Sequence, residues 1–185
     1  MFFNARRHGG NQTLIEKIEY KNQTIEIHHD SDGESPREWD NIGKILYHHS
    51  NYKLGDEEVD TNKYESWDAI EEEIMETINP IIVLPLYVYE HSGITIRTKP
   101  FSCKWDSFQF GLIYATKEFM TKCMPNYTDE DVVKQLKLEI EVLDQYLRGE
   151  VYGFCIKDKN GKDVESCWRY YNKEDMIEEA KGIIG

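Results

Sequence analysis

Residues 151–170 read VYGFCIKDKNGKDVESCWRY, and this stretch indicates the fold most directly. Asn160-Gly161 stands between two segments that suit strands, 151–158 and 162–170. An Asn-Gly pair favours a tight hairpin turn, because both residues tolerate the positive φ angles that such a turn requires. The stretch therefore predicts two neighbouring antiparallel strands near the end of the chain.

A helix is expected immediately before this hairpin. Thr128 and Asp131 form a variant capping box at its start, and Gly149 suits the C′ position after its last turn. Apolar residues recur between them at the three- and four-residue spacing of one helix face. This apolar stripe consists of Val132, Leu136, Ile140, Leu143 and Leu147. We expect it to be buried on a sheet, and its exposure would instead indicate a homo-oligomer interface.

The remaining elements are predicted from alternating and helical apolar patterns. Strands are expected at residues 14–20, 24–28, 81–90, 94–99 and 110–116. Helices are expected at residues 37–49, at 67–78 after an N-capping Ser66, and from Asn172 to about Ile183. The helix at 37–49 is predicted because Trp39, Ile42, Ile45 and Leu46 recur at helical spacing.

Hairpins, and not single strands, separate these helices, which argues against a doubly wound parallel fold. We expect an α+β fold, an antiparallel sheet of hairpins with two or three helices packed on it. Residues 1–12 are expected to form a flexible N-terminal arm, and residues 13–185 a single α+β domain.

Negative charge is concentrated in one block of the chain. The 21 residues from Asp56 to Glu76 contain ten carboxylates and one lysine, a formal charge of −9 out of −13 for the whole chain. Such a surface repels nucleic acid and attracts basic proteins, so no direct nucleic-acid binding is expected. The candidate partner-binding residues are Asp56, Glu57, Glu58, Asp60, Glu72, Glu73 and Glu76. The plainer alternative is that the block is only a solvated surface.

Neither a membrane span nor a secretion signal is evident. No apolar run reaches the ~18 residues that a membrane helix needs, and no apolar segment follows the arginines of MFFNARRHGG at residues 1–10. We therefore expect the protein in the cytoplasm of the cell that makes it. The four cysteines have the spacing of neither a zinc knuckle nor a redox pair, so free thiols are expected.

Candidate metal ligands occur without a spacing that defines a site. Asp40, His91 and Asp106 are the favoured set, because zinc accepts His and carboxylate ligands together. No HxxxH or HExxH motif, P-loop or nucleophile elbow accompanies them. Surface or packing roles are the simpler interpretation. Further candidates are Asp30, Asp32 and His48.

Four stretches are distinctive when taken together. They are ESPREWDN at 34–41, LPLYVYEHSGI at 84–94, FSCKWDS at 101–107, and DQY at 144–146 with VYGF at 151–154. In these stretches the chain resembles a group of small acidic proteins encoded by bacteriophages and related mobile elements. The resemblance implies a phage or prophage setting, and it supplies no catalytic residues to carry over.

Two functional hypotheses follow. In a phage setting, small proteins outside the virion often block host enzymes whose basic channels bind nucleic acid. The first hypothesis is therefore a phage-encoded acidic binding protein that inhibits a host defence or nucleic-acid-processing enzyme by nucleic-acid mimicry, with no cofactor. The alternative is a metal-dependent hydrolase acting on a small phosphorylated or nucleotide substrate, which requires a divalent metal ion.

Overall fold

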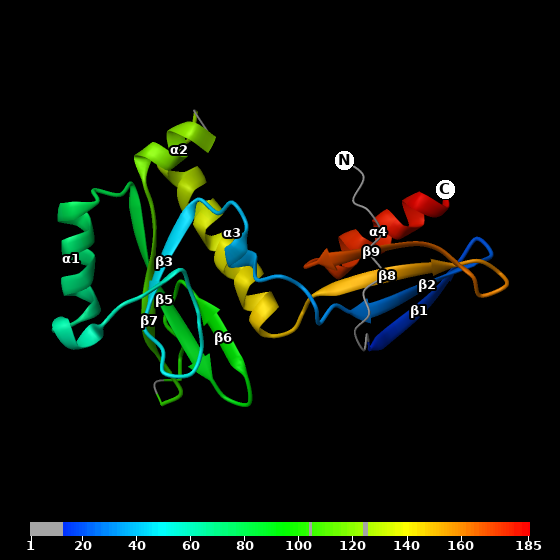
Figure 1. Ribbon diagram of the computed structural model, residues 1–185, viewed down its shortest axis with the longest axis horizontal. Coiled ribbons are helices and arrows are strands. Elements are labelled where there is room, and N and C mark those ends of the chain that lie inside the picture. Colours follow the sequence, from blue (N-terminus) through cyan, green and yellow to red (C-terminus); the bar gives the residue numbers. More distant parts are fainter. Residues whose placement is uncertain (1–12, 104, 124–125) are drawn as a thin grey trace. The chain divides into compact units, whose positions relative to one another are not determined.

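The computed structural model describes residues 13–103, 105–123 and 126–185 (Figure 1). Its strands form two mostly antiparallel sheets, and the described residues contain four α-helices. The expected α+β class is therefore confirmed. The expected N-terminal arm, residues 1–12, lies outside the described residues.

Contacts within the chain define two compact units. In the described part of the chain, one unit comprises residues 13–34 and 149–185, and the other comprises residues 35–148. This grouping does not test the expectation of a single domain, because compact units need not fold independently.

The first unit is a four-stranded antiparallel sheet with the order β1-β2-β8-β9. Its strands are β1 (Leu14–Tyr20), β2 (Gln23–His29), β8 (Tyr152–Lys157) and β9 (Asp163–Tyr170). Both expected hairpins are confirmed, and Gly161 adopts a φ of +78° in the turn between β8 and β9. Helix α4 (Lys173–Ile184) lies across one face of this sheet (Figure 1). The core between them consists of Ile25, Ile27, Phe154, Ile156, Met176 and Ala180.

The second unit is a five-stranded sheet with the order β4-β3-β7-β5-β6. Its strands are β3 (Gly43–Tyr47), β4 (Glu57–Glu58), β5 (Ile82–Glu90), β6 (Ile94–Arg97) and β7 (Ser107–Ala115). Every pair is antiparallel except β3 with the short β4. Three short helical segments lie between the larger elements: η1 (Pro36–Glu38) before β3, η2 (Thr61–Lys63) after β4, and α2 (Lys117–Cys123) after β7.

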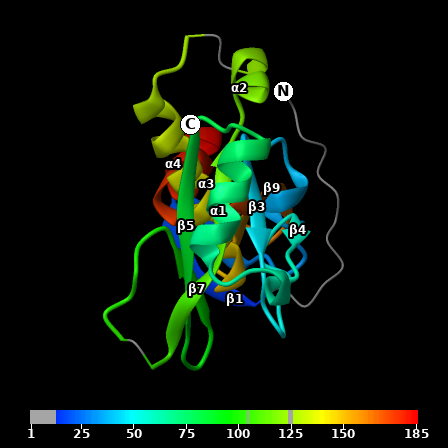
Figure 2. The ribbon, with the colours of Figure 1, turned by 90° about the vertical axis from the view of Figure 1, so that its left-hand side faces the viewer.

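Two helices cover opposite faces of this second sheet (Figures 1 and 2). Helix α1 (Trp67–Thr77) packs Ile70 and Ile74 against Leu112 and Tyr114. Helix α3 (Asp129–Leu147) packs on the other face. The predicted capping box of Thr128 and Asp131 is present, and the predicted stripe is buried apart from the half-buried Leu147.

The prediction of a helix at residues 37–49 is wrong. Only the single turn η1 forms there, and residues 43–47 are the strand β3. Ile45 packs on the α3 side of the sheet, whereas Leu46 packs on the α1 side. A strand covered on both faces carries apolar residues at consecutive positions, so it lacks the alternation that identifies a strand with one solvated face.

The buried stripe of α3 leads to a stability prediction. Replacing the fully buried Leu136 with alanine should lower the free energy of unfolding by about 3 kcal/mol, because the change leaves a cavity in the core. Leu138→Ala on the exposed side of the same helix is the matched control and should change it by less than about 1 kcal/mol. Urea denaturation measures both. Equal losses would contradict the packing described here.

Candidate interaction site

Arg37 anchors the start of the acidic block to the second sheet. Its Nε and Nη2 atoms donate to the two carboxylate oxygens of Asp56 at 3.1 and 2.6 Å. Nη2 also donates to the carbonyl of Gly43 at 2.6 Å. Asp56 in turn accepts the backbone N–H of Ile45 at 2.7 Å. Asp56 is thus already engaged within the protein, which makes it a positioning residue for the block and not a free partner-binding group.

Glu139 of α3 is the buried centre of the same network. Its side chain is 5% exposed and accepts the backbone N–H groups of Ile42 at 2.7 Å and Gly43 at 3.1 Å. Arg37 Nη1 lies 3.4 Å from its second oxygen. Burial raises the pKa of the Glu139 carboxyl, and these hydrogen bonds oppose that shift. The network therefore joins α3 to the segment that leads into β3.

Acidic residues from two elements line one groove of the second unit. The groove has a volume of about 400 Å³ and lies between the β4–η2 segment and α1. Its acidic residues are Glu57, Glu58, Asp60 and Glu73, and its lining also contains Lys44, Lys63 and the buried Leu46, Ile70 and Ile74. Glu58 is exposed on β4, while Tyr64 and Tyr114 add aromatic surface to the lining. We call this feature the acidic groove.

Two carboxylates of the acidic groove form exposed ion pairs with its lysines. Lys44 Nζ lies 2.6 Å from Glu57, and Lys63 Nζ lies 3.6 Å from Asp60. Both pairs are exposed, and exposed ion pairs contribute little to stability. Hydrogen bonds from Asn62 lower the pKa of Asp60, while a hydrogen bond to Glu73 raises the pKa of Tyr64. A stronger external cation can therefore compete for these carboxylates.

The outer face of α1 extends this negative surface. Glu72, Glu73 and Glu76 are exposed. Ile70 and Ile74 point inward, and the indole N–H of the half-buried Trp67 donates to the carbonyl of Gln109 at 3.0 Å. Neither Glu72 nor Glu76 forms an ion pair with any residue in the described ranges. The helix therefore has the predicted orientation, with Glu72, Glu73 and Glu76 in solvent, although Glu71 is half-buried.

The proposed metal ligands Asp40, His91 and Asp106 are not brought together. Asp40 lies just before Gly43, which pairs with Ala115 at one end of β7. Asp106 precedes the other end of that nine-residue strand, roughly 27 Å away at about 3.3 Å per residue. Ligands about 2 Å from a metal cannot be so far apart, so these three cannot share one ion.

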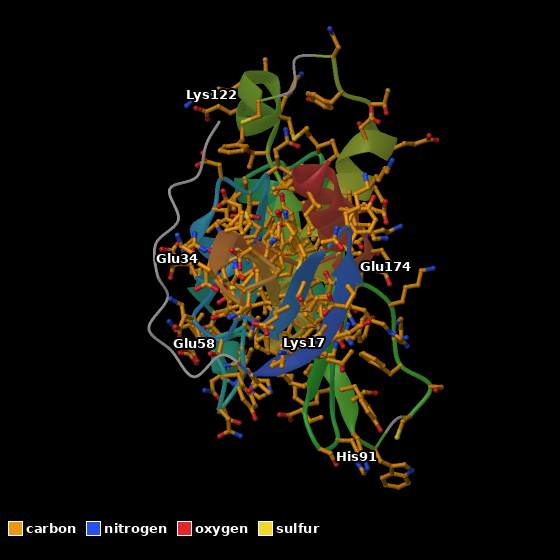
Figure 3. All side chains as sticks on the ribbon, turned by 90° about the vertical axis from the view of Figure 1, so that its right-hand side faces the viewer. Lys17, Glu34, Glu58, His91, Lys122 and Glu174 are labelled. Carbon is orange, nitrogen blue, oxygen red and sulfur yellow. The ribbon has the colours of Figure 1, made fainter. Side chains whose placement is uncertain are left out.

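His91 and Asp106 do lie at the same end of the sheet. The N–H of Glu90, beside His91, donates to the carbonyl of Asp106 at 2.9 Å. Figure 3 shows His91 at the outer tip of the turn between β5 and β6. Asp106 Oδ2 accepts a weak hydrogen bond from the thiol of Cys103 at 3.5 Å. Within the described ranges, no three His, Cys, Asp or Glu side chains are grouped to hold a metal.

The other candidate ligands have ordinary structural surroundings. Asp30 is buried and accepts the backbone N–H groups of Asp32 and Arg169, each at 3.2 Å. Asp30 therefore stabilises the loop after β2. Asp32 and His48 are exposed. The only sequence signal for the Glu139 network is a carboxylate within the apolar face of α3.

Comparisons with protein-family models, with curated proteins and with solved structures find no match to this chain. Among the helices of the described residues, none combines the length and apolar character needed to cross a membrane. The candidate site therefore depends on geometry and charge alone.

The Glu139 network leads to a second stability prediction. Glu139→Ala should lower the free energy of unfolding by about 3 kcal/mol, because it leaves two buried N–H groups and part of Arg37 without acceptors. Glu141→Ala, at an exposed position two residues further along α3, should have almost no effect. Thermal and urea unfolding measure the difference. A loss no larger than that of Glu141→Ala would show that the network is not structural.

Proposed function

We propose that this protein is a phage-encoded acidic binding protein that inhibits a host defence or nucleic-acid-processing enzyme by occupying its basic surface. The observation that carries this proposal is the acidic groove. The β4–η2 segment and α1, which follow one another in the chain, bring carboxylates to one place there, beside the other exposed glutamates of α1. A solvated surface needs no such convergence.

The spacing of these carboxylates is close to the spacing of phosphates in DNA, so they suit a partner whose surface binds phosphates. Glu57 and Glu58 are consecutive strand residues, and Glu72, Glu73 and Glu76 span little more than one helical turn, about 6 Å along the axis. One strand of duplex DNA carries a phosphate about every 3.4 Å. A basic channel that holds a phosphate backbone can therefore meet a comparable number of negative charges on this protein.

The fold holds these carboxylates in place before any partner arrives. Arg37 and Asp56 fix the start of the acidic segment to β3, and α1 is fixed by its buried isoleucines and by Trp67. Groups that are already positioned lose less conformational entropy on binding. The exposed charges are also free to steer a basic partner toward the groove.

Enzyme assays with charge-reversed variants test the proposal. Purified restriction endonucleases and CRISPR effector nucleases cleave DNA in the presence of increasing amounts of the protein. The wild-type chain should inhibit at least one of them at near-stoichiometric concentration. A variant with Glu72, Glu73 and Glu76 all changed to Lys should require at least about a hundredfold more protein, since three attractions become repulsions.

A second triple variant controls for net charge. Glu141, Glu165 and Glu178 are exposed outside the acidic groove. Changing these three to Lys alters the formal charge by the same amount and should leave inhibition within about threefold of wild type. Equal inhibition by the wild type and the α1 variant, or no inhibition of any nuclease, would refute the proposal.

The salt dependence of inhibition gives a further prediction. Raising the salt concentration from about 50 to about 300 mM should weaken inhibition by at least about tenfold, because exposed charges are screened over shorter distances. The measurement is the half-inhibitory concentration at each salt concentration, corrected for the effect of salt on the nuclease alone. Inhibition that does not change with salt would indicate an apolar contact instead.

A further inference from the structure

A second feature of unit 35–148 lies at the opposite end of the sheet from Asp40. The end of β3, the start of β7 and the end of β5 are adjacent there. They bring together His49, Phe108 and Glu90. Phe108 pairs with Val88, two residues before Glu90, so these side chains share one face of the sheet.

His49 forms the floor of this corner. Its side chain is 1% exposed, and its Nδ1 accepts the backbone N–H groups of Asn51 at 3.2 Å and Tyr52 at 3.3 Å. Nδ1 therefore carries no proton, and the proton resides on Nε2. Nε2 lies 3.3 Å from Glu90 Oε1, outside hydrogen-bonding geometry, and it has no other partner among the described residues. The imidazole therefore gives Glu90 no hydrogen bond.

Two aromatic rings flank the same imidazole and remain half in solvent. The ring of Phe108 is stacked 5.9 Å from the His49 ring, and the ring of Tyr52 lies 5.2 Å from it. Phe108 and Tyr52 are 47% and 46% exposed, and the Glu90 side chain is 36% exposed. No Lys or Arg within the described ranges forms an ion pair with Glu90. Glu90 is thus a half-exposed carboxylate beside a histidine that contacts two aromatic rings, and it has no cationic partner among the described lysines and arginines.

We infer that Glu90, Tyr52 and Phe108 form a receptor for one arginine side chain of a protein partner. A guanidinium group can donate two parallel hydrogen bonds to a carboxylate and stack on an aromatic ring at the same time. The chain itself shows this stacking nearby, where the guanidinium of Arg97 lies 3.8 Å over the ring of Phe101.

The adjoining loop indicates that the arginine belongs to a protein and not to a small molecule. Trp105 is 96% exposed, and it precedes Asp106, whose carbonyl accepts the N–H of Glu90. Phe101 stacks on Tyr89, and Arg97 donates to the carbonyls of Lys99 and Pro100, so residues 97–101 are held near the end of β5. Tryptophan and arginine are the residues most enriched at the energetic centres of protein interfaces. The inference rests on the proposed function for the partner's basic character and adds a specific anchor to it.

Titration with a short peptide tests the receptor directly. The probe is N-acetyl-Gly-Arg-Gly-amide, and the readout is the NMR shift of the aromatic protons of Tyr52, Phe108 and His49. The peptide should shift these signals with a millimolar dissociation constant. The citrulline analogue, which is neutral and of nearly the same shape, should bind at least about tenfold more weakly, because it cannot form the charged pair.

Two variants make the result specific to this corner. Glu90→Gln should weaken peptide binding by at least about tenfold, and Tyr52→Leu, which keeps the carboxylate but removes one ring, should also weaken it. Glu141→Gln is the matched control and should bind as the wild type does. If Glu90→Gln does not fold, Tyr52→Leu decides the question. The inference is overturned if the wild type does not bind the peptide, if citrulline binds equally, or if the folded variants bind normally.

The outcomes separate this inference from the proposed function. If the peptide binds as stated but the protein inhibits no nuclease, the arginine receptor stands and the proposed function fails. If the protein inhibits a nuclease but the peptide does not bind, the proposed function stands and the receptor fails.

Discussion

The second unit depends on one buried carboxylate. Glu139 lies inside the apolar face of α3, and it accepts two backbone N–H groups and approaches Arg37. A buried carboxylate without these partners would strongly destabilise the fold. The residues of the Glu34–Asn41 stretch have structural roles. Arg37 connects α3, the start of β3 and the acidic segment, and the Asn41 amide donates to the carbonyl of Pro36 at 2.8 Å.

This connection has a consequence for the acidic block. Asp56 is bound to Arg37, so its charge serves to position the segment that follows. Beyond it, Glu57, Glu58, Asp60 and Glu73 line one groove, where Glu57 and Asp60 form exposed ion pairs with Lys44 and Lys63. The block thus contains an internal anchor and an external surface. A count of charges does not distinguish the anchor from the exposed surface, although only the exposed carboxylates can contact a partner.

The far end of the same sheet has different chemistry. A bulge in the pairing of β5 with β7, between Leu86 and Tyr87, shifts the register before Phe108. Beyond it, Val88 stays buried in the core, while Phe108 opposite it is half exposed and Glu90 approaches His49. The unit therefore has a broad negative surface beside α1 and a compact aromatic corner with one carboxylate at the end of the strands. These features suit diffuse electrostatic attraction and a localised contact, respectively.

Local sequence signals were enough to predict several elements of this fold. The Asn160-Gly161 turn, the Thr128 capping box, the Ser66 cap and the apolar stripe of α3 each depend on residues within a few positions of one another, and the structure confirms them. The same reasoning predicted that α1 turns its glutamates outward, because Ile70 and Ile74 can be buried on only one face. These features need no knowledge of what the helix or hairpin packs against.

Only the tertiary structure determined the rest. Strand β3 resembled a helix in sequence because α1 and α3 cover both of its faces, which removes the alternation of a strand with one solvated side. Asp40 looked like a companion of Asp106 until strand order placed them at opposite ends of β7. His49, Glu90 and Phe108 are far apart in sequence, and only the register of three adjacent strands brings them together. Long-range pairing of this kind depends on how strands align in space, which no local pattern of residues specifies.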